Sequence, residues 1–294
     1  MSATDAADLV DGVRFSLIDG VARVTIERPQ VLNAVDASTH ARLDRIWEQI
    51  ESDASVRVAV ITGAGDRAFS VGADMSAHGV AKTGLEYWAD MDPNGFGGLS
   101  LRRTLDVPVI ARVNGYALGG GLEMVLGADI VIAAEHAQLG LTEPRVGRLA
   151  LDGGIALLTQ RLPYTVAMGM LLTGRKATAA ELHAAGLINE VVPGDELDAA
   201  VDRWVADILR CAPSSVRAVK QMVTRTAHLA PHEARATLVP ALADALQGSD
   251  QDEGVRAFQE KRPPSWDLAT VPPPSATSQS STASQRSRSE EENR

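Results

Sequence analysis

Apolar and polar residues alternate along residues 13–18 and 21–27, and Asp19-Gly20 separates the two runs. Asp-Gly between two alternating segments is a strong hairpin signal, so this stretch predicts two antiparallel strands. Residues 36–52 instead place apolar side chains at helical spacing, with Leu43 and Ile46 on one face, and Ser38 is a plausible N-cap. The chain therefore begins with a predicted β-hairpin followed by an amphipathic helix.

Short apolar segments then alternate with helical ones. Residues 57–62, 107–113 and 129–133 predict buried strands, whereas residues 99–105 and 121–126 predict helices between them. Short buried strands that alternate with helices are typical of an α/β fold with a largely parallel sheet.

After about Gly153 the pattern becomes mainly helical, with one further strand predicted over residues 188–192. Helices are predicted over residues 155–161, 164–172, 178–185, 197–211, 214–227, 232–247 and 250–261. The expected organisation is a flexible N-terminus (1–12), an α/β core (13–200), a helical C-terminal region (201–267) and a Ser-, Thr- and Pro-rich disordered tail (268–294).

Charge and composition exclude several classes of protein. The chain has 38 acidic against 28 basic side chains, which disfavours a general nucleic-acid-binding protein. Its N-terminus does not resemble a signal peptide and no apolar run approaches the ~20 residues of a membrane span, so we expect a cytoplasmic protein that is not embedded in a membrane. The single cysteine, Cys211, allows no intrachain disulfide and is expected in the core.

Two glycine-containing segments suggest a site for a developing negative charge. Residues 114–123 lead from a strand through Gly119, Gly120 and Gly121 into a helix, and Gly72-Ala73 follows another predicted strand. Backbone N–H groups at a helix start are free to bind an anion, and two such donors from separate loops form an oxyanion hole. The alternative is that the glycines only allow close packing of helix and strand.

Two glutamates lie close to these segments in the sequence. Glu123 falls in the first turn of the helix after the glycines, and Glu143 follows one helix and one strand later, just before Pro144. Two carboxyl groups at a reactive centre can hold one water and exchange protons with it. A solvated surface position is the alternative for either residue.

A longer segment, residues 79–98, is rich in Gly and polar residues and includes Tyr87, Trp88 and Phe96. Long connections of this kind are often functional, so we interpret it as a wall or lid of a substrate pocket, with a variable surface loop as the alternative.

These segments together resemble the crotonase (enoyl-CoA hydratase/isomerase) superfamily. The resemblance extends over residues 13–266, and the order and spacing of the motifs make it specific. The motifs are Arg28-Pro29 with Leu32-Asn33-Ala34, residues 68–75, residues 113–123, residues 140–147, Thr173-Gly174 with residues 184–192, residues 216–220 and residues 257–262.

The resemblance implies a spiral of β-β-α units with a helical C-terminal trimerisation region, and a homotrimer or dimer of trimers. It implies an enoyl-CoA hydratase that adds water to a trans-2-enoyl-CoA thioester, or catalyses the reverse dehydration, without a metal or a separate cofactor, since coenzyme A is part of the substrate. Ala73 and Gly120 would donate to the thioester oxygen, Glu123 would activate water and Glu143 would protonate the α-carbon, with the roles open to reversal. The implied acyl-CoA contacts are Val31, Leu32, Ala34, Ala73, Asp74, Met75, Ser76, Gly120, Phe258 and Lys261.

The sequence departs from the family pattern after Glu143. Ala150 replaces a frequent proline, and Asp152 adds a carboxylate that we interpret as a helix N-cap, or alternatively as a third acid of an isomerase or specialised dehydratase. Arg145 and Arg148 would pair either with an acidic acyl group or with surface carboxylates. The C-terminal residues 253–266 resemble members that act on crotonobetainyl-CoA.

A non-catalytic homologue that binds acyl-CoA or a protein remains the alternative from another class. RNA-binding relatives carry a Lys-rich helix, whereas residues 39–52 contain no lysine.

Overall fold

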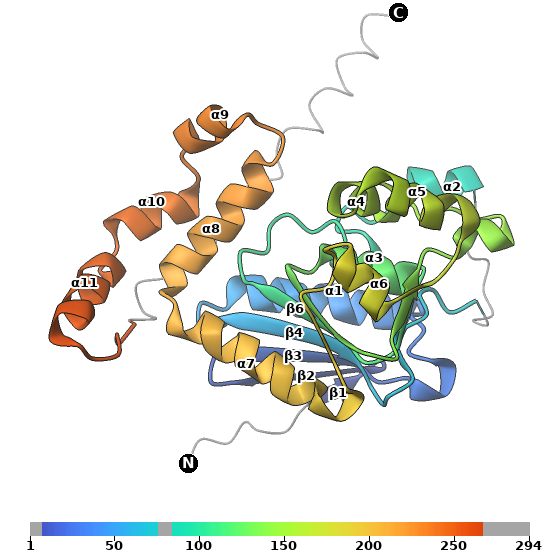
Figure 1. Cartoon of the computed structure of the whole chain (residues 1–294), viewed down its shortest axis with the longest axis horizontal. Coiled ribbons are helices and arrows are strands. Elements are labelled where there is room, and N and C mark those ends of the chain that lie inside the picture. Colours follow the sequence, from blue (N-terminus) through green and yellow to red (C-terminus); the bar gives the residue numbers. More distant parts are fainter. Residues whose placement is uncertain (1–7, 76–83, 267–294) are drawn as a thin grey trace, which may run out of the picture.

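The computed structural model describes residues 8–75 and 84–266, and Figure 1 labels its helices and strands. Residues 1–7, the predicted tail at 268–294 and Ser76 lie outside the described residues. Residues 8–10 form a strand that pairs with the first predicted strand, so the sheet starts upstream of residue 13.

The larger sheet has seven strands, and its central part is parallel, as predicted. The first two strand pairs are antiparallel, and every later pair is parallel. In spatial order the strands are β1 (Asp8–Val10), β2 (Val13–Ile18), β3 (Val21–Ile26), β4 (Val58–Gly63), β6 (Val109–Val113), β8 (Ile130–Ala134) and β11 (Glu190–Val192).

A smaller sheet lies beside the first one. Its strands, in spatial order, are β10 (Ala177–Thr178), β9 (Gln138–Gly140), β7 (Tyr116–Leu118) and β5 (Ala68–Ser70). Along the chain, a strand of the larger sheet (β4, β6 or β8) is followed each time by a strand of the smaller sheet (β5, β7 or β9). A helical segment then follows each of these pairs. This repeated unit is the predicted β-β-α spiral.

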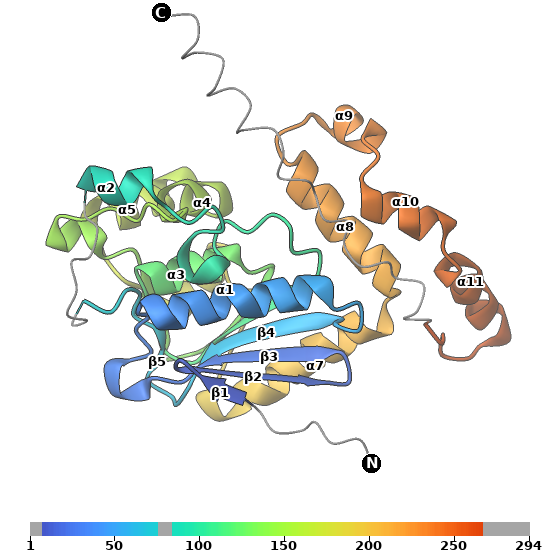
Figure 2. The same cartoon turned by 180° about the vertical axis from the view of Figure 1, so that it is seen from behind.

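Helices cover both faces of the larger sheet (Figures 1 and 2). Leu43, Ile46 and Trp47 of α1 (Ala37–Ser52) are buried in the main core on one face. Leu197 and Val201 of α7 (Leu197–Arg210) are buried against β4, β6 and β8 on the other face. Because helices pack on both faces of the sheet, the strands bury side chains on both sides, which explains their continuous apolar sequences.

The remaining helices form two groups. Those near the smaller sheet are α2 (Gly84–Ala89), α3 (Gly120–Gly127), α4 (Gly154–Arg161), α5 (Tyr164–Thr173) and α6 (Ala179–Ala184). Those of the C-terminal arm (residues 213–260) are α8 (Pro213–Thr226), α9 (Pro231–Ala236), α10 (Pro240–Gln247) and α11 (Asp250–Glu260). Both views show the arm extending from the side of the body (residues 8–210) opposite α2 and α5.

Three long polar side chains of α8 join the arm to the body. Arg217 donates to the Val56 carbonyl at 2.9 Å, and Lys220 binds Asp129 at 2.7 Å. Gln221 donates to the buried Asp106 carboxyl at 2.6 Å. The arm is thus attached through hydrogen bonds rather than through an extended apolar core.

Several local predictions were wrong, for identifiable reasons. The N-cap of α1 is Asp36, whose Oδ1 accepts from the Thr39 N–H at 2.9 Å, whereas Ser38 only donates to Asp36. Residues 99–105 form no helix, because glycines with positive φ end the short 3-10 helix at Phe96–Gly98.

The single helix predicted over residues 232–247 is two helices. Pro240 has no N–H to continue the first one, and Val239 before it is extended. Cys211 is exposed rather than buried, and it is the extended residue that directly follows the end of α7 at Arg210.

Within the described ranges, no helix combines the length and apolar character that a membrane crossing requires.

Candidate active site

A cavity of about 550 Å³ lies between the two groups of glycines and the segment that follows β9. Tyr87 of α2 and Phe96 form part of its wall, together with Glu123 of α3 and the segment 142–152. The described part of residues 79–98 therefore contributes to a pocket wall, as predicted, while residues 79–83 are outside the described ranges.

Strand pairing brings the two glutamates to this cavity. β7 and β9 are parallel neighbours, with Leu118 opposite Gly140, so their carboxyl ends meet at one edge of the smaller sheet. Glu123 lies in the first turn of α3 after β7, and Glu143 opens the 3-10 helix Glu143–Val146 after β9. Both side chains line the cavity, although 20 residues separate them in the sequence.

Glu123 is almost completely buried, with 3% of its surface exposed. One of its oxygens, Oε1, accepts a hydrogen bond from the Gly154 N–H at 2.9 Å. Burial, together with the neighbouring carboxyl groups of Asp152 and Glu143, raises the pKa of Glu123 to about 8, against the hydrogen bond from the Gly154 N–H. The carboxyl group can therefore hold a proton close to neutral pH.

Glu143 is less enclosed, and burial raises its pKa as well. Its Oε2 is buried and accepts no hydrogen bond from any described residue. Its Oε1 lies against the backbone of Gly119, where a methyl group would come within 2.8 Å of it. An unpartnered carboxyl oxygen near a second buried carboxyl group is a suitable environment for a water molecule or a substrate hydroxyl.

The two proposed oxyanion donors lie in adjacent segments. A side chain at Gly72 (φ +85°) would approach the Gly120 nitrogen to 2.8 Å, so only glycine allows the two segments to touch. Val35 bonds to the Gly72 carbonyl and the Asp74 N–H, which leaves the Ala73 N–H on the opposite side of the chain. Gly120 begins α3, where an N–H has no intrahelical acceptor.

The Phe96 ring packs directly on the second donor. A methyl group at Gly120 would lie 2.6–2.7 Å from three ring carbons of Phe96. Both Ala73 and Gly120 line the cavity.

Asp152 differs from the predicted N-cap. The helix α4 begins at Gly154 after Gly153, and no side chain caps it. The Asp152 carboxyl is buried at the cavity instead and accepts a hydrogen bond from the Tyr87 hydroxyl. Asp152 could be singled out from the sequence as a possible third acid, but its partnership with Tyr87, 65 residues away, had no local signal.

Three of the ten predicted acyl-CoA contacts, Ala73, Met75 and Gly120, line the cavity. The Arg28 guanidinium binds the Ala34 carbonyl at 2.5 Å and Asp74 at 3.0 Å, which holds the turn containing Val31 and Leu32 next to residues 73–75. Met75 is exposed and lines the cavity.

Phe258 and Lys261 do not join this group within one chain. Phe258 lies on α11 and Lys261 directly follows that helix, in the arm and on the other side of the body from α2 (Figure 1). The two arginines after Glu143 lie in different surroundings. Arg145 donates to the Thr173 carbonyl at 3.2 Å, whereas Arg148 lines the cavity, where the predicted pairing with an acyl group stays open to it.

Comparison with known proteins agrees with this arrangement. The model of the enoyl-CoA hydratase/isomerase family matches residues 17–268, and the chain belongs to that family. A carnitinyl-CoA dehydratase of Shigella flexneri is 36% identical over 250 residues, which cover 84% of this chain and 94% of the relative. One of Salmonella arizonae is 36% identical over 260 residues, 87% of this chain and 98% of the relative.

Solved structures show the same fold. The enoyl-CoA hydratase of Mycobacterium tuberculosis H37Rv superposes with a TM-score of 0.78 at 30% identity, covering 88% of this chain and 100% of that one. The enoyl-CoA hydratase of Bacillus anthracis gives a TM-score of 0.74 at 30% identity, covering 87% and 98%. The fold and the family of the protein are thereby established.

Proposed function

We propose that the protein is an enoyl-CoA hydro-lyase that adds water to a trans-2-enoyl-CoA thioester or removes it from the 3-hydroxyacyl-CoA. The observation that carries this proposal is the meeting of Glu123 and Glu143 in one cavity, next to the backbone of Ala73 and Gly120. A hydratase needs both a proton acceptor and a proton donor, together with donors to the thioester oxygen.

In the hydration direction, the Ala73 and Gly120 N–H groups would hold the thioester oxygen as it gains charge. One glutamate takes a proton from water while the water oxygen bonds to the β-carbon, and the other gives a proton to the α-carbon of the resulting enolate. Burial raises the pKa of Glu123, to about 8, and that of Glu143 as well, so the pair can hold the proton that the α-carbon receives. We keep the roles that the resemblance implies, with Glu123 activating water and Glu143 protonating the α-carbon, and dehydration exchanges them.

A substrate with a cationic acyl group is a second candidate within the same reaction. Relatives named carnitinyl-CoA dehydratases match nearly the whole chain, and their named substrate carries a quaternary ammonium group. The cavity offers the buried carboxyl of Asp152 and the rings of Tyr87 and Phe96, which are the groups that attract such a cation.

The test follows the absorbance of the conjugated thioester of crotonyl-CoA and of crotonobetainyl-CoA with purified protein. Wild type should hydrate at least one of them, and Glu143→Gln should slow turnover by about 10²–10⁴-fold, the usual contribution of a general acid or base. Glu123→Gln should lose hydration as well; loss of hydration with retained double-bond migration would favour an isomerase. No turnover of any chain length would favour a binding role.

We further propose that the protein assembles as a homotrimer or dimer of trimers in the cytoplasm and requires no metal or separate cofactor. Large apolar side chains stay exposed along the arm, with Phe258 85% exposed, which supports a second copy as their cover. In such an assembly, Phe258 and Lys261 would reach the coenzyme A portion bound to a neighbouring copy.

A further inference from the structure

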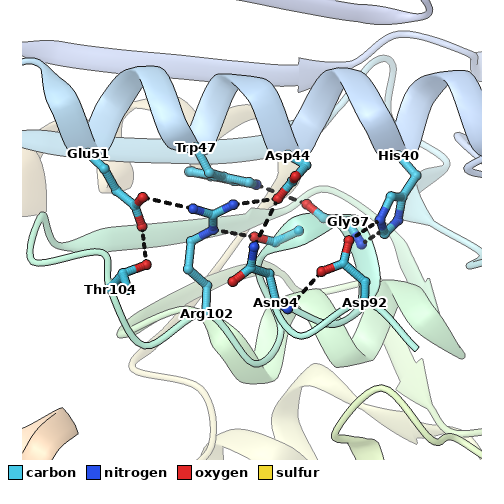
Figure 3. Close-up of polar contacts among 10 residues, drawn as sticks. His40, Asp44, Trp47, Glu51, Asp92, Asn94, Gly97, Arg102 and Thr104 are labelled. Atoms are coloured by element: carbon cyan, nitrogen blue, oxygen red, sulfur yellow. Dashed lines mark hydrogen bonds and ion pairs between the residues drawn. The ribbon is translucent and has the colours of Figure 1, made fainter. Parts of the chain in front are cut away.

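One face of α1 carries polar groups although it packs against another segment of the body. His40, Asp44, Trp47 and Glu51 follow one another at intervals of three or four residues, so they form a single stripe along the helix. Figure 3 shows this stripe facing residues 92–104, the segment that contains a wall of the cavity. None of the four takes part in the reaction proposed above.

The stripe binds the backbone of Gly97 through both of its polar groups. The Gly97 N–H donates to Nδ1 of His40 at 3.3 Å, and the Gly97 carbonyl accepts from Nε1 of Trp47 at 3.0 Å. Gly97 has a φ of +65°, and a methyl group there would approach the Met124 sulfur to 2.5 Å, so both the conformation and the space favour glycine. This short stretch of backbone is therefore fixed by side chains of α1.

A carboxylate sets the tautomer of His40. Because Nδ1 accepts from the Gly97 N–H, it carries no proton, and the ring proton of the neutral side chain is on Nε2. Nε2 lies 3.0 Å from Oδ2 of Asp92 and donates to it. Oδ1 of Asp92 accepts from the Asn94 N–H at 2.7 Å, so the carboxylate is itself held in place. Asp92 thus turns the acceptor nitrogen of His40 toward Gly97.

Phe96, the residue directly before Gly97, connects this arrangement to the site. The His40 and Phe96 rings meet edge to face, with centroids 6.3 Å apart and planes at 79°. The Phe96 ring also packs on Gly120, where a methyl group would lie 2.6–2.7 Å from three ring carbons. Gly120 is the second proposed donor to the thioester oxygen, so a single aromatic ring lies between His40 and that donor.

A donor to a developing oxyanion is effective only if it is fixed before the reaction. One such donor contributes about 10²–10³-fold to turnover, and a displacement of about 1 Å can remove much of that. Gly120 and its neighbours Gly119 and Gly121 have no side chains, and within the described residues no side chain caps the start of α3. The Phe96 ring therefore supplies a packing contact that the glycines cannot supply themselves.

We propose that His40, oriented by Asp92, is a positioning residue that fixes Phe96 against Gly120 and so aims the Gly120 N–H at the thioester oxygen. This inference rests on the proposed hydro-lyase reaction and adds to it a residue of α1. His40 touches neither water nor thioester in this scheme, and it acts through Gly97 and Phe96.

His40→Leu is the decisive variant, because leucine fills similar space but accepts no hydrogen bond. With the thioester that wild type hydrates, we expect kcat to fall by about 10-fold with KM nearly unchanged, since part of one donor's contribution is lost while the acyl-CoA contacts stay. His40→Asn should stay close to wild type, because its Oδ1 stands near the place of Nδ1 and can accept from Gly97. Thr104→Val is the matched control: it removes a hydrogen bond to Glu51 at the far end of the stripe and should leave kcat unchanged.

A second readout needs neither turnover nor substrate. The chain has four phenylalanines, so labelling with para-fluorophenylalanine gives four fluorine NMR signals, and Phe96→Leu identifies the one from Phe96. We expect His40→Leu to shift and broaden this signal, whereas His40→Asn and Thr104→Val should keep it in place. If wild type hydrated none of the thioesters, the proposed function alone would be overturned, and this signal would still show whether His40 fixes Phe96.

Polarisation of a bound thioester separates positioning from a structural role. Cinnamoyl-CoA should absorb at longer wavelength on the protein than in water, because the N–H groups of Ala73 and Gly120 draw charge onto its carbonyl oxygen. This absorption shift should shrink in His40→Leu and return in His40→Asn.

Three outcomes would overturn the inference. An unmoved Phe96 signal in His40→Leu would show that His40 does not hold the ring. An absorption shift that is missing in wild type, or that survives in His40→Leu, would show that the ring does not set the donor. Equal losses of turnover and thermal stability in His40→Leu and Thr104→Val would leave only a structural role.

Discussion

The body and the C-terminal arm bury apolar surface in opposite ways. In the body, α1 and α7 enclose a parallel sheet between them, and large side chains such as Trp47 and Phe69 are completely buried. In the arm, the buried positions of α8 are mainly small or polar, such as Ala218 and Gln221, while Val219 and Val223 stay exposed.

This difference separates two sources of stability. The body contains a closed core and the complete set of residues that we assign to the reaction, so its fold depends on its own contacts. The arm holds to the body by hydrogen bonds of Arg217, Lys220 and Gln221 and leaves apolar surface for another molecule. Changes in the body should therefore alter unfolding or catalysis, whereas changes in the arm should alter assembly.

The largest expected effect on stability comes from a buried charge in the body. The Arg102 side chain is 2% exposed and bridges Asp44 and Glu51 of α1, as Figure 3 shows. Arg102→Ala would leave two carboxylates without their cation, which should lower the free energy of unfolding by about 3–5 kcal/mol in a denaturant titration.

The control for Arg102 is Arg23→Ala, since Arg23 pairs with Asp202 on the surface, where both side chains are about half exposed. This change should cost about 1 kcal/mol or less. Equal effects of the two substitutions would contradict the view that the Arg102 cluster holds α1 to residues 92–104.

An intermediate effect should appear in the pH dependence of stability. Because the pKa of Glu123 is raised from 4.5 to about 8 on folding, the folded state binds its proton more tightly. The associated stability is complete below about pH 4.5 and is lost as pH rises toward 8, by at most ~1.4 kcal/mol per pH unit. Unfolding measured from pH 5 to 8 should show Glu123→Gln gaining stability relative to wild type as pH rises.

An ion pair near the end of the arm should show the opposite dependence of stability on pH. The Arg262 side chain holds the pKa of the partly buried Glu253 at about 2, so any stability from this pair is present above pH 4.5 and is lost as pH falls toward 2. Glu253→Gln should therefore leave the pH 5–8 range unchanged. A slope in that range that survives in Glu123→Gln would show that another group dominates it.

The smallest expected effect concerns the arm alone. Phe258→Ser removes the most exposed aromatic side chain of α11 and should weaken self-association by about 10–100-fold in sedimentation experiments, as for an aromatic interface residue. The free energy of unfolding of the body should not change. Ile18→Ser, at an exposed apolar position of the hairpin, is the control; equal assembly of both variants would show that α11 does not contact a second copy.

Much of the fold could be predicted because its determinants are local. The hairpin at Asp19-Gly20, the amphipathic pattern of α1 and the apolar strands each depend on neighbouring residues. The errors arose where distant contacts decide the outcome. Residues 99–105 contain helix formers, yet the Arg102 side chain turns inward to Asp44 and Glu51, and the preceding glycines set the path of the chain.

The site, like the fold, could be predicted only in part. Glu123 and Glu143 could be named from motif spacing, and the strand pairing of β7 with β9 explains why both line one cavity. The bond between Tyr87 and Asp152 could not be found, because it joins two segments with no shared pattern. The burial of the two glutamates, which raises the pKa of both, likewise depends on packing between distant segments rather than on a local sequence pattern.

The pairing of Leu118 with Gly140 has a consequence for how this chain tolerates changes in length. Glu123 lies five residues after Leu118, and Glu143 lies three residues after Gly140. Two short backbone segments that start at one strand pair therefore set the separation of the two carboxyl groups. The turn at Glu135 and His136, between β8 and β9, is not part of either segment. The separation of the two carboxyl groups is therefore set within the smaller sheet, and it does not depend on the length of that turn.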